Sequence, residues 1–257
     1  MPTWGHREPE EFRAAAGADL GRYGSVAAES VDVEGVRQRE EDGLFEATAG
    51  DRRTRTGKEV IRATGVEHAF PGIPGYAECW VSGIFYCLYY HGQEERGAAS
   101  GAYWASGDTG AVVPALRVAR QAPRMADEIA KFAKAPERAR IPRTSTTAWG
   151  GTRGVPGSQA EDEASEARCW RGQLGLEPTP AGTTIRAHPP SNQTSALCVF
   201  AVGDCAGPMR TATAAPHSGM CTGGSTPSRI QAESYGQRAM FWLCCLMTRN
   251  RGKIGWA

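Results

Sequence analysis

The sequence predicts a loop-rich α/β protein rather than a helix bundle, and three observations lead to this prediction. Glycine and proline are frequent, with 32 and 16 copies among 257 residues. An apolar stretch at 101–105 is followed by a glycine-containing turn and then by helical periodicity, which is the order of a βα unit. A second apolar stretch, 198–203, leads into Asp204, as is typical of a strand at the ligand-binding edge of an α/β sheet.

The composition limits the classes of function. With 40% hydrophobic and 22% charged residues the chain is globular, and it is long enough to bury a large core. The net charge of +1 predicts neither a nucleic acid nor an anionic membrane as partner. The longest apolar run, 239–247, is far shorter than the about 20 residues of a spanning helix. Because no secretory signal or paired Cys/His spacing occurs, we expect a cytoplasmic protein with reduced cysteines and no metal site.

The first quarter of the chain indicates a helix followed by a three-stranded meander. Residues 9–24 have apolar positions at helical spacing and acidic residues in the first turn. The meander covers 26–63, with Asp-Gly at 42–43 and Gly-Asp at 50–51 as turns and with 58–63 as the third strand.

The rest of the chain has weaker local signals. The Pro/Gly cluster at 70–75 indicates a linker. Residues 112–132 have helical periodicity that two prolines interrupt, and residues 134–172 show no periodicity and are expected to be irregular. A stretch of small residues at 211–224 precedes a helix predicted at about 230–247.

Gly203 and Asp204 form the first candidate site. The carboxylate of Asp204 is expected at the carboxyl end of a strand, and Gly203 lets a ligand approach the backbone. A plain turn is the alternative. The element Arg-Ala-Thr-Gly at 62–65 is a second signal, and it is weak when taken alone. An Ala-Thr-Gly element followed by a strand-turn-helix unit and then by the Gly-Asp element is more specific than either element by itself.

Residues 105–110 occupy the place of a glycine-rich phosphate-binding turn. Gly107, Asp108 and Gly110 belong to this turn, and Ala105 stands where the pattern has its first glycine. In such a turn the backbone N–H groups and the helix N-terminus receive a pyrophosphate. The alternative is a turn that binds nothing.

Three residues are candidates for proton or thiol chemistry. Cys87 is followed four residues later by His91, and a cysteine beside a histidine can act as a thiolate nucleophile. A buried core cysteine is the alternative, since the stretch is aromatic. His217 is either a proton carrier or a helix cap.

These motifs together resemble those of the thioredoxin-reductase-like FAD/NAD(P)-binding oxidoreductases. Within that family the chain is most similar to the branch of gliotoxin-type dithiol oxidases of secondary metabolism. Two stretches are quite specific: Pro-Gly-Ile-Pro-Gly-Tyr-Ala-Glu-Cys-Trp at 71–80 and Phe-Ala-Val-Gly-Asp-Cys-Ala at 200–206. Further matches span 1–20, 63–97, 107–127, 173–180 and 192–233.

The resemblance implies a two-dinucleotide-binding-domain flavoprotein. Residues 1–77 and 173–257 would be the two halves of a discontinuous FAD domain, and residues 78–172 an inserted, Rossmann-like NAD(P) domain. It also implies noncovalent FAD, NADPH as a second cofactor, and a thiol or disulfide substrate, either a small molecule or a thioredoxin-like protein. Relatives are commonly homodimers.

The same resemblance implies roles for single residues. Cys87 and His91 would belong to the redox motif C-x-x-C-H, and His217 would assist proton transfer. The FAD contacts it implies are Thr64, Gly65, Gly203, Asp204, Thr211 and Ala212, and the implied NADPH contacts are Gly107, Asp108 and Gly110.

The sequence departs from the family pattern in three ways. The first FAD-binding βαβ unit with its G-x-G-x-x-G is missing, so the chain is expected to be truncated at its N-terminus. Tyr90 stands in place of the second redox cysteine, which leaves Cys87 without a partner at that spacing. Residues 134–172 replace strands of the inserted domain. The alternatives to an active oxidoreductase are therefore a non-catalytic, truncated relative or an NAD(P)-binding module.

Overall fold

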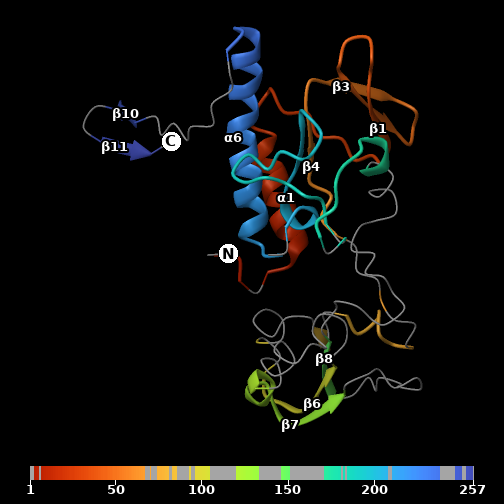
Figure 1. Ribbon diagram of the computed structural model, residues 1–257. Coiled ribbons are helices and arrows are strands. Elements are labelled where there is room, and N and C mark those ends of the chain that lie inside the picture. The colour runs from red at the N-terminus through yellow and green to blue at the C-terminus, as the bar shows by residue number, and fades with distance from the viewer. Residues whose placement is uncertain are drawn as a thin grey trace. The chain divides into compact units, whose positions relative to one another are not determined.

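The computed structural model divides into two compact units, which are described separately. The first unit comprises residues 1–66 and 163–257, and the second comprises residues 67–162. Figure 1 shows the elements of both units by label and colour. The described residues are 3–5, 7–66, 70, 74–80, 83–85, 93, 96–104, 120–132, 146–150, 171–180, 182, 184–207, 210–237, 247–250 and 253–256.

The first unit opens with the helix α1, Pro9–Leu20, as the spacing predicts. Pro9 lies in its first turn, where a missing N–H costs nothing. The helix is four residues shorter than expected because Gly21, a poor helix former, caps it and donates to the carbonyl of Gly17 at 3.0 Å. No residue of α1 is buried.

Three antiparallel strands form the meander: β1, Val33–Gln38; β2, Phe45–Ala49; and β3, Thr54–Gly57. The predicted meander and both its turns are confirmed, but the third strand is not where the sequence places it. Residues 58–63 were expected there, and the polar β3 takes that position. Because β3 lacks apolar alternation, local pattern does not reveal it.

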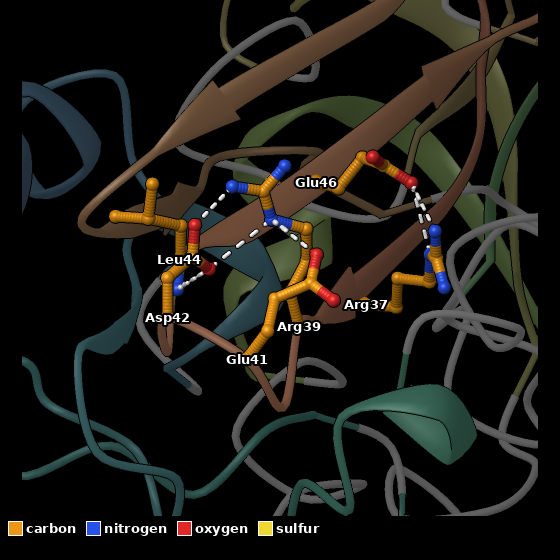
Figure 2. A network of polar contacts seen from close by, with 6 residues as sticks. All are labelled: Arg37, Arg39, Glu41, Asp42, Leu44 and Glu46. Atoms are coloured by element: carbon orange, nitrogen blue, oxygen red, sulfur yellow. Dashed lines mark hydrogen bonds and ion pairs between the residues drawn. The ribbon is translucent and has the colours of Figure 1, made fainter.

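Polar side chains reinforce the β1–β2 hairpin, as Figure 2 shows. Arg37 and Glu46 face each other in the register, and the guanidinium of Arg37 donates to Glu46 Oε1 at 2.9 and 2.7 Å. In the turn, Asp42 accepts hydrogen bonds from the backbone N–H of Leu44 at 3.1 Å and from Arg39. These contacts explain why an Asp-Gly turn closes this hairpin.

The strand β4, Val60–Arg62, leaves the meander and pairs in parallel with β9, Val199–Ala201. All three residues of β9 are buried. The parallel pairing joins segments almost 140 positions apart in the sequence, and the buried residue of β4 is Arg62. The core of the unit joins β1, β2, the segment 174–187 and β9 through Val36, Phe45, Leu176, Ile185, Val199, Ala201 and Cys205.

After β9 the chain forms the short 3₁₀ helix η2, Gly203–Cys205, and then the long helix α6, Ala214–Ser234. The strand at 198–203 and its Gly-Asp turn are confirmed. The helix predicted at about 230–247 is confirmed only for 230–234: α6 begins earlier, in the stretch of small residues, and ends at Ser234. Residues 247–250 form β10, Met247–Asn250, which pairs with β11, Lys253–Trp256.

The described part of the second unit has a four-stranded, all-parallel sheet in the order β5-β8-β6-β7. Its strands are β5, Ile84–Phe85; β6, Ala98–Trp104; β7, Ala126–Phe132; and β8, Thr146–Gly150. The strand predicted at 101–105 is confirmed as part of β6. The chain passes from β6 to β7 on one side and later returns to β8 on the other side of β6, so the topological switch point of the sheet lies between β6 and β8.

Two predictions for this unit are wrong. Residues 126–132, expected to be helical, form β7 after the 3₁₀ helix η1, Ala122–Arg124. The strand β8 lies within 134–172, where no regular structure was expected. In both cases hydrogen bonds with β6 stabilise a strand that the local residue preferences do not favour. The linker at 70–75 is described only in part, and none of the described helices could cross a bilayer.

Candidate functional site

The carboxyl ends of β4 and β9 meet at one edge of the first unit. The two strands run parallel, and the N–H of Val202 donates to the carbonyl of Arg62 at 2.9 Å. Thr64 and Gly65 follow β4 in the chain, and Gly203 with Asp204 forms the start of η2 after β9. The structure therefore brings the Ala-Thr-Gly and Gly-Asp elements to the same edge.

Cys205 links the two strand ends from inside. Its thiol lies 3.6 Å from the carbonyl oxygen of Arg62 and 3.2 Å from that of Val202, and the residue is 3% exposed. Burial raises the pKa of this thiol, against the opposing effects of the Arg62 charge and of hydrogen bonding with Thr64. Cys205 is thus a neutral thiol that ties Thr64 and the η2 turn into one structure.

Arg62 is a charged residue in the core, with only 2% of its surface exposed. Its Nε donates to Thr64 Oγ1 at 3.2 Å, so the guanidinium helps to orient the threonine hydroxyl. The sequence alone indicates no role for Arg62. The signal that could have revealed it is a single arginine at the end of an apolar strand, because a buried charge needs a specific environment.

Gly203 has a left-handed backbone conformation, which the sequence did not predict. Its φ is +72°, a region that favours glycine, and its N–H donates to Ser218 Oγ at 2.9 Å. A Cβ at this position would lie 3.5 Å from the Cβ of Ala215, within ordinary contact distance. Gly65 also has a positive φ, +68°, and a Cβ there would meet nothing within 4 Å.

Thr211 and Ala212 lead into α6 close behind this turn in the chain. Thr211 Oγ1 accepts a hydrogen bond from the N–H of Ala214 at 3.0 Å, which satisfies one free donor at the start of the helix. His217 lies inside α6 rather than at its N-cap, and its Nε2 is 3.7 Å from the sulfur of Cys221. His217 is therefore not a helix cap.

The remaining predicted site residues are Cys87, His91, Gly107, Asp108 and Gly110, and they lie outside the described residues, as Tyr90 does. In the sequence, Gly107, Asp108 and Gly110 lie three to six positions after Trp104, the last residue of β6. Within the described ranges, no group of three or more His, Cys, Asp or Glu side chains could hold a metal ion.

Sequence reasoning also assigned no role to Asn192, Ser218 and Thr222, which hydrogen-bond around the Gly203 turn. Ser218 and Thr222 could have been recognised as hydroxyl residues four positions apart in a glycine-rich stretch. They were missed because that stretch was not predicted to be a helix.

Comparisons with known proteins identify relatives of the chain, although no family model matches it. Thioredoxin reductase aclD of Aspergillus oryzae is 30% identical over 249 residues, which cover 85% of this chain and 79% of the relative. Thioredoxin reductase tcpT of Claviceps purpurea is 30% identical over 272 residues, covering 94% and 84%.

Solved structures show the same fold. HlmI superposes with a TM-score of 0.68 at 20% identity, over 89% of this chain and 78% of HlmI. The thioredoxin reductase from Streptococcus pyogenes superposes with a TM-score of 0.64 at 17% identity, over 90% and 83%. Because two curated thioredoxin reductases match most of their own length at 30% identity, the chain belongs to the thioredoxin reductase family.

Proposed function

We propose that the chain is a FAD-dependent oxidoreductase that acts on thiols or disulfides, with FAD held at the joint edge of β4 and β9. The coarser class, a thioredoxin-reductase-like oxidoreductase, follows from the family. The observation that supports the finer proposal is the meeting of Thr64–Gly65 with Gly203–Asp204 at that edge. Ligands of parallel α/β sheets bind outside the carboxyl ends of the strands.

The residues at this edge fit a flavin dinucleotide. Gly65 has a positive φ and open space where a Cβ would stand, so a large planar ligand can approach its backbone closely, and Gly203, also with a positive φ, turns the chain towards Asp204 beside Ala215. Asp204 supplies a carboxylate that can accept hydrogen bonds from ligand hydroxyl groups, and Thr64 supplies a hydroxyl held by Arg62. In this proposal Thr64 and Gly65 adjoin the isoalloxazine, and Asp204 holds the ribityl or pyrophosphate region.

When bound, FAD supplies two-electron redox chemistry, and the protein's part is to bind and orient. Thr211 and Ala212 complete the proposed cofactor contacts next to the start of α6. Cys205, buried and neutral, keeps the ends of β4 and β9 together beneath the site. The charge of Arg62 lies beside Thr64, where it would favour negative charge on a nearby ligand.

For the second unit we propose NADPH binding at the carboxyl end of β6. The topological switch point of this sheet lies between β6 and β8, and ligands of open parallel sheets bind outside the carboxyl ends of the strands at such points. Gly107, Asp108 and Gly110 come directly after this strand in the sequence. The discontinuous first unit supports the proposed assignment of 1–77 and 173–257 to the FAD domain and of 78–172 to the NADPH domain.

We further propose Cys87 as the thiol that reacts with substrate and His91 as its acid and base. The substrate class is a small dithiol or disulfide, or a thioredoxin-like protein. Tyr90 favours a second candidate function, that of a flavin-binding relative without disulfide chemistry, because a phenol cannot form a disulfide with Cys87. The two candidates differ in whether NADPH-dependent disulfide reduction occurs.

Reconstitution with FAD tests the proposal. The purified full-length chain is mixed with FAD, desalted and examined for the visible absorption of protein-bound flavin. We expect wild type to retain flavin and Asp204→Asn to retain markedly less. Asp42→Asn, a matched change in the β1–β2 turn, should bind like wild type. Failure of the wild-type chain to retain any flavin would refute the proposed FAD site.

A further inference from the structure

We infer that Ser218 and Asn192 are positioning residues for the Gly203–Asp204 turn. Through hydrogen bonds they fix this turn and β9 against the first half of α6, and so set the place of the Asp204 carboxylate. The inference rests on the proposed function, since it concerns the same FAD site. Both residues are assigned an effect through the turn and no contact with cofactor or substrate.

Ser218 forms the direct link. Its Oγ accepts a hydrogen bond from the N–H of Gly203 at 2.9 Å and donates to the carbonyl of Ala215 at 2.8 Å. The hydroxyl therefore has its orientation set by the helix and presents a lone pair to the turn. Because the amide of Gly203 is the first N–H of η2, this bond fixes where the turn towards Asp204 begins.

Asn192 forms the second link, from β9 to α6. Its carbonyl accepts the N–H of Ala201 at 3.0 Å, while its side-chain Nδ2 lies 3.1 Å from the carbonyl oxygen of Ser218 and 3.0 Å from Thr222 Oγ1. The φ of Asn192 is +60°, a conformation that asparagine tolerates better than most residues. One residue thus contacts the strand through its backbone and the helix through its side chain.

The rest of α6 offers little apolar attachment. Among its 21 residues, all of them described, only Thr222 is buried, and that side chain donates to the carbonyl of Ser191 at 2.8 Å. Three glycines and Pro227 within the helix lower its intrinsic stability. Polar links, rather than a hydrophobic face, therefore determine where the first half of α6 lies against the turn.

The test compares two variants with a matched control in the full-length chain. Ser218→Ala removes the acceptor for the Gly203 amide. Asn192→Gly removes the side-chain donors but keeps a residue that tolerates positive φ. The control is Ser225→Ala, since Ser225 also donates to a carbonyl three residues earlier, that of Thr222 at 2.9 Å, two turns further along α6.

Two quantities are measured: hydrogen exchange of the Gly203 amide without FAD, by NMR, and the dissociation constant for FAD. We expect Ser218→Ala to accelerate exchange and to weaken FAD binding, each by about fivefold, the effect of one hydrogen bond. Asn192→Gly should weaken FAD binding to a similar degree. Ser225→Ala should leave both quantities within about twofold of wild type, and Ser218→Thr, which keeps a hydroxyl, should restore both.

Unchanged exchange of the Gly203 amide in Ser218→Ala would overturn the inference, as would unchanged FAD affinity in both variants. Equal losses in Ser225→Ala would also overturn it, because the effect would then be general weakening of α6. If wild type binds no FAD, the proposed function fails, and the exchange measurement still decides whether Ser218 fixes the turn.

Discussion

Glu59 and Arg229 join the start of β4 to the second half of α6 through a buried ion pair. Nε and Nη2 of Arg229 lie 2.6 and 2.5 Å from Glu59 Oε1, and the two side chains are 12% and 3% exposed. Burial is the largest single influence and by itself would lower the pKa of Arg229, but the hydrogen bonds and charges of Glu59 and Cys198 together outweigh it, and the pKa is raised. The arginine is therefore charged at every pH at which the protein folds.

Breaking this pair should destabilise the first unit. Removing one partner leaves a buried charge uncompensated, so we expect Arg229→Met to lower the free energy of unfolding by about 3 kcal/mol. The exposed pair of Arg186 and Glu177 serves as control, and Arg186→Met should cost under about 1 kcal/mol. Urea unfolding followed by circular dichroism measures both, and equal losses would contradict the prediction.

Replacing Gly203 by alanine should impair both folding and cofactor binding. A positive φ costs an L-residue about 1–2 kcal/mol, so Gly203→Ala should lose that much stability. Gly236, with φ +62° and open space around a Cβ, is the matched position just after α6. Gly236→Ala should lose a similar amount but keep wild-type FAD affinity. Flavin titration separates the two, and equal affinities would contradict the prediction.

Acid should weaken the β1–β2 hairpin through Asp42. The hydrogen bond from Arg39 holds the pKa of this carboxyl below its ordinary value of 3.8. A lowered folded-state pKa means that the contribution is complete above 3.8 and is lost as the pH falls through the folded-state value. Asp42→Asn should therefore flatten the fall of unfolding free energy below that pH. If the unfolding free energy of the variant falls with acid as steeply as that of wild type, Asp42 is not the cause of the fall.

Cys205 should be the slowest of the described cysteines to react with a thiol reagent. Burial raises its pKa, so at neutral pH it presents even less thiolate than an ordinary cysteine. Cys221, which is only half-buried, should be alkylated at least about tenfold faster. Timed labelling with iodoacetamide and peptide mass spectrometry gives both rates, and the two should become equal in denaturant. A faster Cys205 in the folded chain would contradict the burial seen here.

A second cysteine in the proposed redox motif should allow a disulfide to form there. In Tyr90→Cys the new thiol stands at the C-x-x-C spacing from Cys87, and mild oxidation should remove this pair from the free-thiol count. Tyr89→Cys introduces a thiol one position away and is the control for spacing. A free-thiol count in Tyr90→Cys that stays as high as in the control after oxidation would argue against Cys87 as a redox residue.

Local signals predicted the elements whose conformation depends on their own residues. Pro9 and the acidic first turn start α1, and Asp42 with Gly43 closes the hairpin. The Gly203–Asp204 turn was predicted from an apolar run that ends in Gly-Asp, whereas the positive φ of Gly203 appears only in the structure. The roles assigned to Thr64 and Asp204 remain proposals, although the two elements lie at one edge.

The strand identity of 126–132 and the helix α6 could not be predicted in this way. Residues 126–132 repeat apolar positions as a helix would, yet they pair in parallel with β6. The segment of α6 is rich in glycine, and its position depends on Asn192 and Ser218, which hydrogen-bond across other elements. Hydrogen-bond partners that are distant in the sequence cannot be identified from the residues next to each position.

The sequence alone determined the family resemblance, α1, the two hairpin turns and the strand that ends in Gly-Asp, because short-range sterics and periodicity specify them. The tertiary structure alone decided that β4 leaves the meander for β9, that Arg62 lies in the core and that α6 begins at Ala214. These features depend on hydrogen bonds between segments that are far apart in the chain and on the burial of side chains where those segments pack. These interactions form only when the segments come together in the folded protein.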